Sequence, residues 1–132
     1  MKAIDSSSVA KYVNREQNWE VAARALGEGC LSLELAVKEI GNSLWKRVGR
    51  GEISGDQAKR TLSDFVGALP FRTAEQEELY VPAMEIAATL KLPYYDALFL
   101  ALARERGLSL VTSDSTQADA ARKLGLGVQF IE

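Results

Sequence analysis

The sequence contains no histidine, and this absence excludes more kinds of chemistry than any other feature of the composition. A Ser-His-Asp or Cys-His mechanism, a histidine-based zinc site and a histidine general base are all excluded. The single cysteine, Cys30, cannot form an internal disulfide, which fits a reducing compartment and favours a cytoplasmic protein. No apolar run approaches membrane-spanning length, and Asp5 interrupts the N-terminus where a signal peptide would continue its apolar stretch. We therefore expect no membrane association, and chemistry that depends on carboxylates, hydroxyls, lysine, tyrosine or a bound ion.

The composition is that of an ordinary folded domain. Of the 132 residues, 47% are hydrophobic and 26% are charged, which allows one core without disulfide or metal staples. We predict a single domain over residues 1–132. The net charge of −2 gives no general attraction for nucleic acid, so a nucleic-acid surface has to come from local clustering of basic residues.

Short apolar runs alternate with longer segments of helical pattern along the chain. Strands are predicted at 2–4, 30–33, 108–112 and 127–131, with a further strand or extended link at 70–72. The longer segments predict helices, including a helical hairpin at about 34–69. A helix from about Thr73 is expected to kink or break at Pro82. Strands that alternate with helices indicate an α/β fold with a mostly parallel central sheet.

Polar residues at the junctions between these segments are candidates for helix caps. The expected caps are Ser6 to Ser8 for the first helix, Asn18 for a helix at 19–26, Ser54 or Asp56 for the second helix of the hairpin, and Ser115 or Thr116 for the last helix.

The stretch from Pro93 to Asp114 is the most hydrophobic part of the chain and contains two carboxylates at its ends. Asp96 lies in the first turn of a helix that Pro93 begins and Gly107 ends. Asp114 lies just past the strand at 108–112. A carboxylate beside a core is costly unless a cation or hydrogen bonds compensate its charge. These two acids are therefore our first candidates for a functional site, although each also suits a helix N-terminus.

Two further acids are expected at the same edge of the sheet. Asp5 follows the first strand, where by itself it would suit a helix cap, and Glu39 lies in the helix after the second strand. Open parallel sheets bind ligands at the carboxyl ends of their strands, where Asp5, Asp96 and Asp114 should emerge together. Glu39 reaches that edge if its helix begins there, whereas by itself it would be an ordinary surface residue.

Carboxylates that converge repel one another, so a cation is needed to keep all of them ionised. Hard divalent ions such as Mg²⁺ prefer oxygen ligands, activate water and stabilise the charge that develops on phosphorus. The four acids therefore predict metal-assisted hydrolysis of a phosphodiester. Asn42, one turn after Glu39, and the hydroxyls of Ser7 and Thr112 are expected to orient ligands or water.

A basic cluster near the end of the helix that starts at residue 34 is the best candidate for contact with nucleic acid. It contains Lys38, Lys46, Arg47 and Arg50 around the aromatic Trp45. Such charges can follow phosphates while an aromatic ring stacks on a base. The alternative is a solvated helix end whose basic residues complement the helix dipole.

At these residues the sequence resembles the PIN-domain family, and most closely its VapC-like branch, the toxin ribonucleases of type II toxin–antitoxin pairs. The matching pieces, in chain order, are Asp5-Ser6-Ser7, Glu39 with Asn42, Tyr95-Asp96-Ala97 and Thr112-Ser113-Asp114. The resemblance implies a three-layer α/β/α fold and Mg²⁺- or Mn²⁺-dependent endonucleolytic cleavage of RNA. It assigns the family's acidic positions to Asp5, Glu39, Asp96 and Asp114, its hydroxyl positions to Ser7 and Thr112, and its polar position to Asn42. It also implies a homodimer and inhibition by a small antitoxin protein.

Two other functions fit parts of the same pattern. An inactive PIN-like scaffold would bind RNA or a protein without cutting, although the intact carboxylates favour an active enzyme. A phosphoryl-transferring α/β domain would use Asp5 as a nucleophile, but Ser7 stands where a haloacid-dehalogenase-like motif has a second aspartate.

Some members of the PIN family carry a further acid where this chain has the neutral Gln117, which leaves the number of metal ions open.

Overall fold

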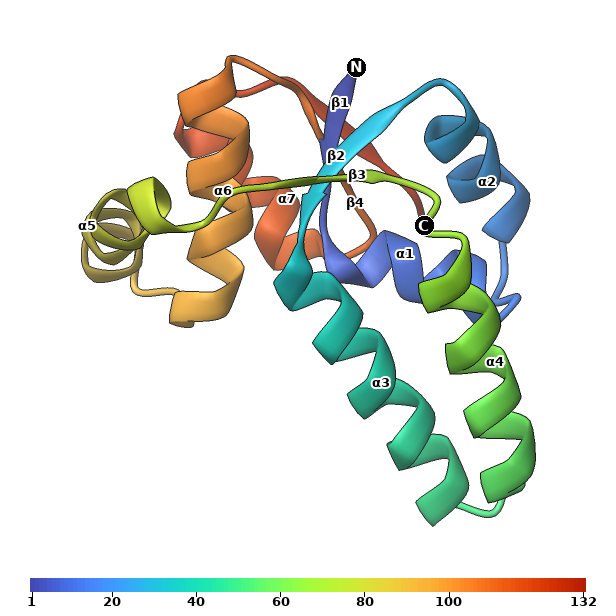
Figure 1. Cartoon of the computed structure of the whole chain (residues 1–132). Helices are drawn as coiled ribbons and strands as arrows, with labels where there is room; N and C mark the ends of the chain where they lie inside the picture. The colour runs from blue at the N-terminus through green and yellow to red at the C-terminus, as the bar shows by residue number, and fades with distance from the viewer.

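A five-stranded parallel sheet forms the centre of the computed structural model, which describes residues 1–132 (Figure 1). The strands are β1 (Lys2–Ile4), β2 (Cys30–Leu33), β3 (Arg72–Ala74), β4 (Leu110–Thr112) and β5 (Val128–Phe130). Their order in the sheet is β3-β2-β1-β4-β5, and every neighbouring pair is parallel. The predicted α/β fold with a mostly parallel sheet is confirmed. The strand order reverses between β1 and β4, the kind of position at which parallel sheets bind ligands.

Seven α-helices and one 3-10 helix connect the strands. They are α1 (Ser6–Val13), α2 (Trp19–Gly27), α3 (Glu34–Gly49), α4 (Gly55–Gly67), the 3-10 helix η1 (Glu77–Leu79), α5 (Tyr80–Leu90), α6 (Tyr94–Arg106) and α7 (Ser115–Lys123). Figure 1 shows α6 and α7 on one side of the sheet and α1 and α2 on the other. The fold therefore has the three α/β/α layers that the family resemblance implies.

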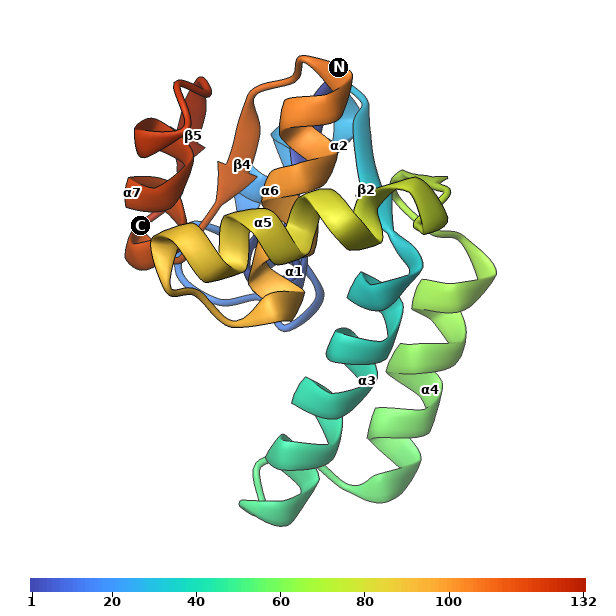
Figure 2. The same ribbon diagram turned by 90° about the vertical axis from the view of Figure 1, so that its left-hand side faces the viewer.

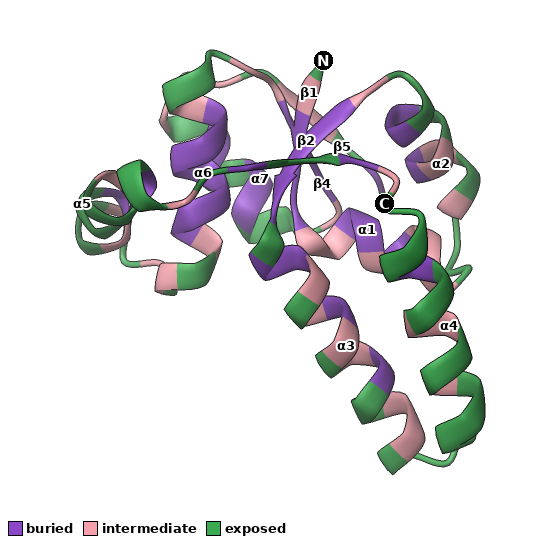
Figure 3. Cartoon of the chain, in the orientation of Figure 1, coloured by how far each residue is buried: buried purple, intermediate pink, exposed green.

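Helix α6 is the most deeply buried helix of the core. Every residue from Ala97 to Ala103 is at most 3% exposed, and Figure 3 shows most of α6 and of the sheet as buried. A helix that is apolar on every face requires neighbours on several sides, and α6 packs against β1, β2, α5 and α7. This packing fixes Asp96, in the first turn of α6, at the carboxyl edge of the sheet.

No single helix is long and apolar enough to cross a membrane; the segments Glu77–Leu90 and Tyr94–Arg106 meet that test only as a pair bent by 115°.

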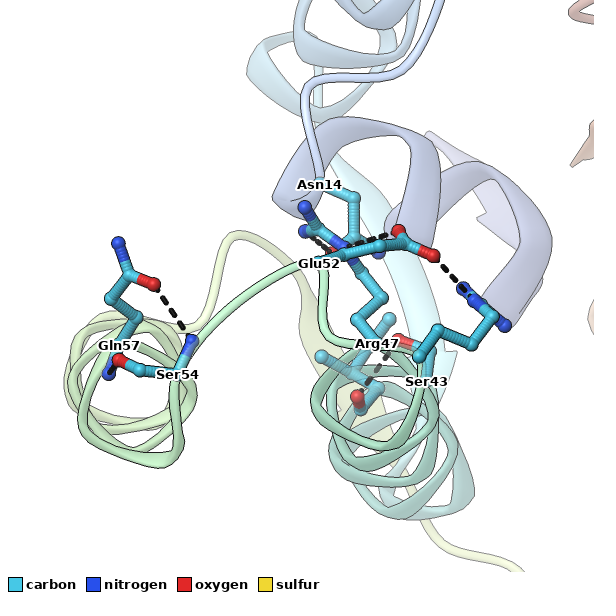
Figure 4. Close-up of polar contacts among 8 residues, drawn as sticks. Asn14, Ser43, Arg47, Glu52, Ser54 and Gln57 are labelled. Atoms are coloured by element: carbon cyan, nitrogen blue, oxygen red, sulfur yellow. Dashed lines mark hydrogen bonds and ion pairs between the residues drawn. The ribbon is translucent and has the colours of Figure 1, made fainter.

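Helices α3 and α4 pack against each other and extend away from the sheet (Figures 1 and 2). Helix α4 buries only Phe65 and exposes most of its remaining surface (Figure 3). Of the two expected caps for α4, Ser54 is the one that the structure shows. Its Oγ accepts from the Gln57 N–H at 3.1 Å, and Gln57 Oε1 accepts from the Ser54 N–H at 2.8 Å (Figure 4). This reciprocal pair satisfies two N–H groups that have no partner within the helix.

The prediction of a helix from Thr73 with a kink or break at Pro82 is wrong. Thr73 lies in β3, and α5 runs without interruption from Tyr80 to Leu90. Pro82 is the third residue of α5, within the first turn, where N–H groups have no partner in the helix. The missing N–H of proline therefore costs nothing at this position.

Three of the expected helix caps also differ from the structure. Asp5 and Asp114 cap α1 and α7, so the hydroxyl residues after them are not the caps, and the cap role that the sequence also allowed for the two aspartates is confirmed. Asp5 directly follows β1 and Asp114 lies two residues after the end of β4, and both have the extended backbone that an N-cap residue needs. Asn18 precedes α2 with a φ of 66°, in the left-handed region instead of the extended conformation of an N-cap residue, and makes no cap bond. Its Nδ2 donates to the Glu132 carbonyl oxygen at 2.8 Å.

Candidate active site

A cavity of about 270 Å³ opens at the carboxyl edge of the sheet, and we call it the acidic cavity. It is lined by Asp5, Ser6, Ser7, Ala10, Glu39, Ile40, Asn42, Ser43, Lys46, Asp96, Phe99 and Asp114. The four predicted acids therefore lie around one space, together with two of the three polar residues expected to assist them. The starts of α1, α3 and α6 lie along this edge of the sheet in Figure 1.

Asp5 is the most buried of the four acids, at 4% exposed, because it directly follows the central strand β1. Its Oδ1 accepts hydrogen bonds from the N–H groups of Ser7 and Ser8 at 3.1 and 3.4 Å and from Ser7 Oγ at 2.6 Å. Its Oδ2 accepts from Thr112 Oγ1 at 2.6 Å. Burial nevertheless raises the pKa of Asp5 from 3.8 to about 6; the hydrogen bonds act in the opposite direction, and the charge of Asp114 adds a further rise. The hydrogen bonds therefore fix the orientation of this carboxylate, but no positively charged side chain is paired with it.

Asp96 and Asp114 lie at the more open side of the acidic cavity. Burial, and then the negative charges of Asp114 and Glu39, raise the pKa of Asp96 above its usual 3.8. Asp114 is exposed, and its Oδ1 accepts from the N–H groups of Thr116 and Gln117 at 2.8 and 3.1 Å. The carboxylates therefore influence one another across the cavity, which is the electrostatic situation that the sequence predicts.

The hydroxyls of Ser7 and Thr112 connect the ends of β1 and β4. They lie 3.3 Å apart, and each of them donates to Asp5. Ser7 Oγ also accepts from the Ser113 N–H at 2.8 Å, while Thr112 Oγ1 accepts from the Asp114 N–H at 3.1 Å. Thr112 is completely buried, so it acts on the cavity through Asp5 and the backbone of Asp114.

Two further polar contacts join helices at the site, and the sequence pattern did not predict them. Ser6 Oγ donates to Glu39 Oε1 at 2.7 Å, which links α1 to α3. Gln117 is only 3% exposed, and its Nε2 donates to the Asp96 carbonyl oxygen at 2.8 Å, which links α7 to α6. Gln117 lies three residues after Asp114, where a polar side chain commonly reaches back to the start of its own helix. Its side chain instead bonds to α6, so the spacing alone does not predict this contact.

The structure separates the four residues of the predicted basic cluster. Lys46 lines the acidic cavity. Lys38 lines a different cavity, whose walls come from α3, β3 and η1. Arg47 and Arg50 both contact Glu52. Of the four, Lys46 is therefore the one that the fold puts beside the acids.

The donor set of the acidic cavity fits a hard divalent cation. Every salt bridge of the chain involves Glu52, Glu105 or Asp119, so none of the four acids is paired with a lysine or arginine. Carboxylate, hydroxyl and amide oxygens are the ligands that Mg²⁺ and Mn²⁺ prefer. In this arrangement no three acids lie close enough together to hold one ion. Their assignment as metal ligands stays a prediction.

Fold and cavity together define an α/β/α protein whose acidic cavity lies at the point where the order of a parallel sheet reverses. Comparison with known families makes the class specific, because residues 2–123 match the model of the PIN domain. The chain belongs to the PIN-domain family.

Individual relatives agree with this assignment. The chain is 31% identical over 121 residues to ribonuclease VapC3 from Pyrobaculum aerophilum, an alignment that covers 88% of this chain and 91% of that protein. The solved structure of PAE2754 from the same organism is 25% identical and has a TM-score of 0.74, covering 96% of this chain and 87% of that one. A toxin–antitoxin complex from Klebsiella pneumoniae, at 15% identity, shares the fold with a TM-score of 0.57 over 87% of this chain and 88% of that one. The predicted resemblance to PIN domains of the VapC kind is confirmed.

Proposed function

We propose that this chain is a Mg²⁺- or Mn²⁺-dependent endoribonuclease and the toxin of a toxin–antitoxin pair. The observation that carries the proposal is the acidic cavity, which Asp5, Glu39, Asp96 and Asp114 line without a salt bridge to any lysine or arginine. Uncompensated carboxylates favour a divalent cation, and such an ion suits the hydrolysis of a phosphodiester. The similarity to a ribonuclease, VapC3, supports RNA as the substrate.

The residues around the metal site have separate roles in this proposal. The four acids would hold the metal, which when bound supplies an activated water and neutralises charge on the phosphate. Ser7 and Thr112 keep the two oxygens of Asp5 in one orientation. Ser6 orients Glu39 in the same way.

Two exposed residues of α3 complete the wall that faces the substrate. Lys46 lines the acidic cavity and offers a positive charge to a phosphate oxygen. Asn42 lies one turn before it and offers an amide that can bind a water or a sugar hydroxyl.

Incubation of the purified chain with an unstructured RNA labelled at its 5′ end tests the proposal. We expect internal cleavage products with Mg²⁺ or Mn²⁺ and none with EDTA. Asp96→Asn keeps the shape of the side chain but removes its charge. It should lower the rate by more than the roughly 10- to 100-fold that loss of a hydrogen-bond partner of a metal ligand costs. Glu105→Gln, at the other end of α6, should cleave at the normal rate. Cleavage by Asp96→Asn at the wild-type rate would contradict the proposal. Stepwise shortening of the RNA from one end would show that the activity is that of an exonuclease and not of an endonuclease.

The same experiment separates the two alternative functions. An inactive PIN-like scaffold would bind the RNA and leave it intact with every metal. A nucleophilic Asp5 would form an acyl phosphate, which mass spectrometry detects as an added phosphoryl group. Both oxygens of Asp5 already accept hydrogen bonds from neighbouring residues. This favours a role for Asp5 as a metal ligand over a role as a nucleophile.

A small antitoxin and a second copy of the chain are the proposed protein partners. The K. pneumoniae structure of similar fold is a toxin–antitoxin complex, which supports the first. For the second, apolar side chains that are 48% to 77% exposed gather on α5 and at the start of α6: Tyr80, Val81, Met84 and Tyr95. Exposed apolar patches of this kind mark protein contacts, and we assign this one to a homodimer. Light scattering of the purified chain, alone and with the antitoxin, measures both associations.

A further inference from the structure

A second cavity adjoins the acidic cavity along the crevice between α1 and α3, and we call it the arginine cavity. It is lined by Asn14, Glu16, Arg47, Arg50 and Glu52, and it shares Ala10 and Ser43 with the acidic cavity. The acidic cavity takes its residues from the earlier turns of both helices, and the arginine cavity from the later turns. The two cavities therefore follow one another from the helix starts to the helix ends.

Glu52 holds two guanidinium groups at the end of α3. Arg47 Nε donates to Glu52 Oε1 at 3.4 Å, and Arg50 Nε donates to Glu52 Oε2. Arg47 Nη1 also donates to Asn14 Oδ1 of α1 at 2.8 Å, and Figure 4 shows Asn14 and Glu52 converging on Arg47. A guanidinium has several N–H donors in a fixed fork, so both arginines keep donors for a further oxyanion. Glu52 cancels one of their two positive charges, and Glu16, which also lines the cavity, brings a second carboxylate. The formal charges of the lining therefore balance, and the guanidinium groups are free for another anion only when that anion displaces Glu52.

We propose that the arginine cavity binds the phosphate next to the scissile one in an RNA strand, and that Glu52 competes with this phosphate for the guanidinium groups. This subsite, which rests on the proposed function, extends the bound strand from the acids towards the α3–α4 turn. The carboxylates repel a polyanion, so a strand stays bound only where its neighbouring phosphates meet positive charge. Arg47 and Arg50 present forked donors that match phosphate oxygens, in a cavity that adjoins the acids.

The same contacts would also tie the α3–α4 turn to α1, and the choice of variants separates the two roles. Arg47 is 27% exposed and bonds across two helices, so its replacement would disturb their packing. Arg50 and Glu52 are more exposed, and an exposed ion pair contributes little to stability. A structural tie requires both residues, so their variants would act alike on RNA binding. A competitor requires that the variants act with opposite signs.

Fluorescence anisotropy of a labelled oligouridylate, measured over a range of salt concentrations, gives the affinity and its salt dependence. The background is Asp96→Asn, so that the RNA stays intact. We expect Arg50→Gln to weaken binding several-fold and to reduce the slope of log affinity against log salt by about 0.7, the value for one phosphate contact on a single strand. Glu52→Gln should strengthen binding several-fold and make the slope steeper.

The Arg104–Glu105 pair at the far end of α6 provides matched controls. Arg104 Nη2 lies 3.6 Å from Glu105 Oε1 on the edge of the sheet opposite the cavities. Arg104→Gln and Glu105→Gln make the same charge changes there and should alter neither quantity. The subsite is overturned if both pairs of variants behave alike, or if Glu52→Gln weakens binding as Arg50→Gln does. Absence of metal-dependent cleavage by the parent chain would instead overturn the proposed function, because the binding measurement does not depend on cleavage.

Discussion

The two ends of the crevice between α1 and α3 hold their charges in different ways. At the strand end, Asp5 is buried and accepts four hydrogen bonds, yet its pKa is raised to about 6. At the helix end, Arg50 and Glu52 are 59% and 44% exposed and contact each other. Water and salt screen charges at the helix end far more than at the strand end. A change of one charge should therefore have large consequences beside β1 and small ones at the end of α3.

Asp5→Asn should have the largest effect on catalysis and tests the strand end of this comparison directly. The amide keeps the size of the carboxylate but removes the charge that would hold a cation. We expect the rate of RNA cleavage to fall by more than the roughly 10- to 100-fold that loss of a hydrogen-bond partner of a metal ligand costs. Asp64→Asn makes the same change on exposed α4 and should cleave normally. A modest loss for Asp5→Asn, no greater than that of Arg50→Gln, would remove the distinction between the two ends.

The pH dependence of stability should show the cost of the buried charge. In EDTA, the folded chain keeps a proton on Asp5 that the unfolded chain releases, because folding raises the pKa from 3.8 to about 6. The contribution of Asp5 to stability is thus complete below the unfolded value and is lost as the pH rises through about 6, a loss of roughly 3 kcal/mol.

Asp5→Asn avoids this loss, so urea denaturation should give similar unfolding free energies for the two proteins near about pH 4. By about pH 7 the variant should be the more stable protein. Added Mg²⁺ should narrow that difference by stabilising the wild type, since a cation that binds the folded state adds to its stability. Parallel curves for the two proteins at all pH values would show that burial of Asp5 is not costly.

Ser6→Ala tests whether a single hydroxyl contact matters at the acidic cavity. Loss of the 2.7 Å bond to Glu39 frees that carboxylate, and we expect about a tenfold lower cleavage rate. Ser43→Ala is the matched control, because Ser43 lines the same cavity but donates to the Ile40 carbonyl oxygen within its own helix. Equal cleavage rates for the two variants would show that the hydrogen bond from Ser6 to Glu39 does not contribute to catalysis.

The sequence predicts the site residues that strand order positions, and it does not predict those that helix packing positions. Asp5 and Asp114 each follow an apolar run, and parallel strands bring their carboxyl ends to one edge of a sheet, so their shared location could be inferred. The contacts of Ser6 with Glu39 and of Gln117 with Asp96 join separate helices. Their existence depends on how the helices are rotated against each other, which the packing of the whole core decides.

The basic cluster illustrates the same limit at the level of one helical position. Lys46 and Arg47 are adjacent in the sequence, but successive residues on a helix point about 100° apart. Lys46 consequently lines the acidic cavity, whereas Arg47 turns to Asn14 and Glu52. Composition and spacing identified the cluster as a whole, and only the orientation of α3 divides it.

Lys46→Gln should have the smallest effect on RNA cleavage. The salt dependence of this effect shows whether the charge of Lys46 is screened, as at the helix end of the crevice, or shielded from salt, as at the strand end. Lys46 lines the acidic cavity but is exposed, so we expect a KM for RNA that rises a few-fold with little change in kcat. The effect should vanish at high salt, because water and ions screen an exposed charge. Lys59→Gln on exposed α4 is the control and should leave KM unchanged. A loss of kcat that persists at high salt would instead give Lys46 a part in the chemistry beside Asp5, and the boundary between the two ends would then lie further along α3.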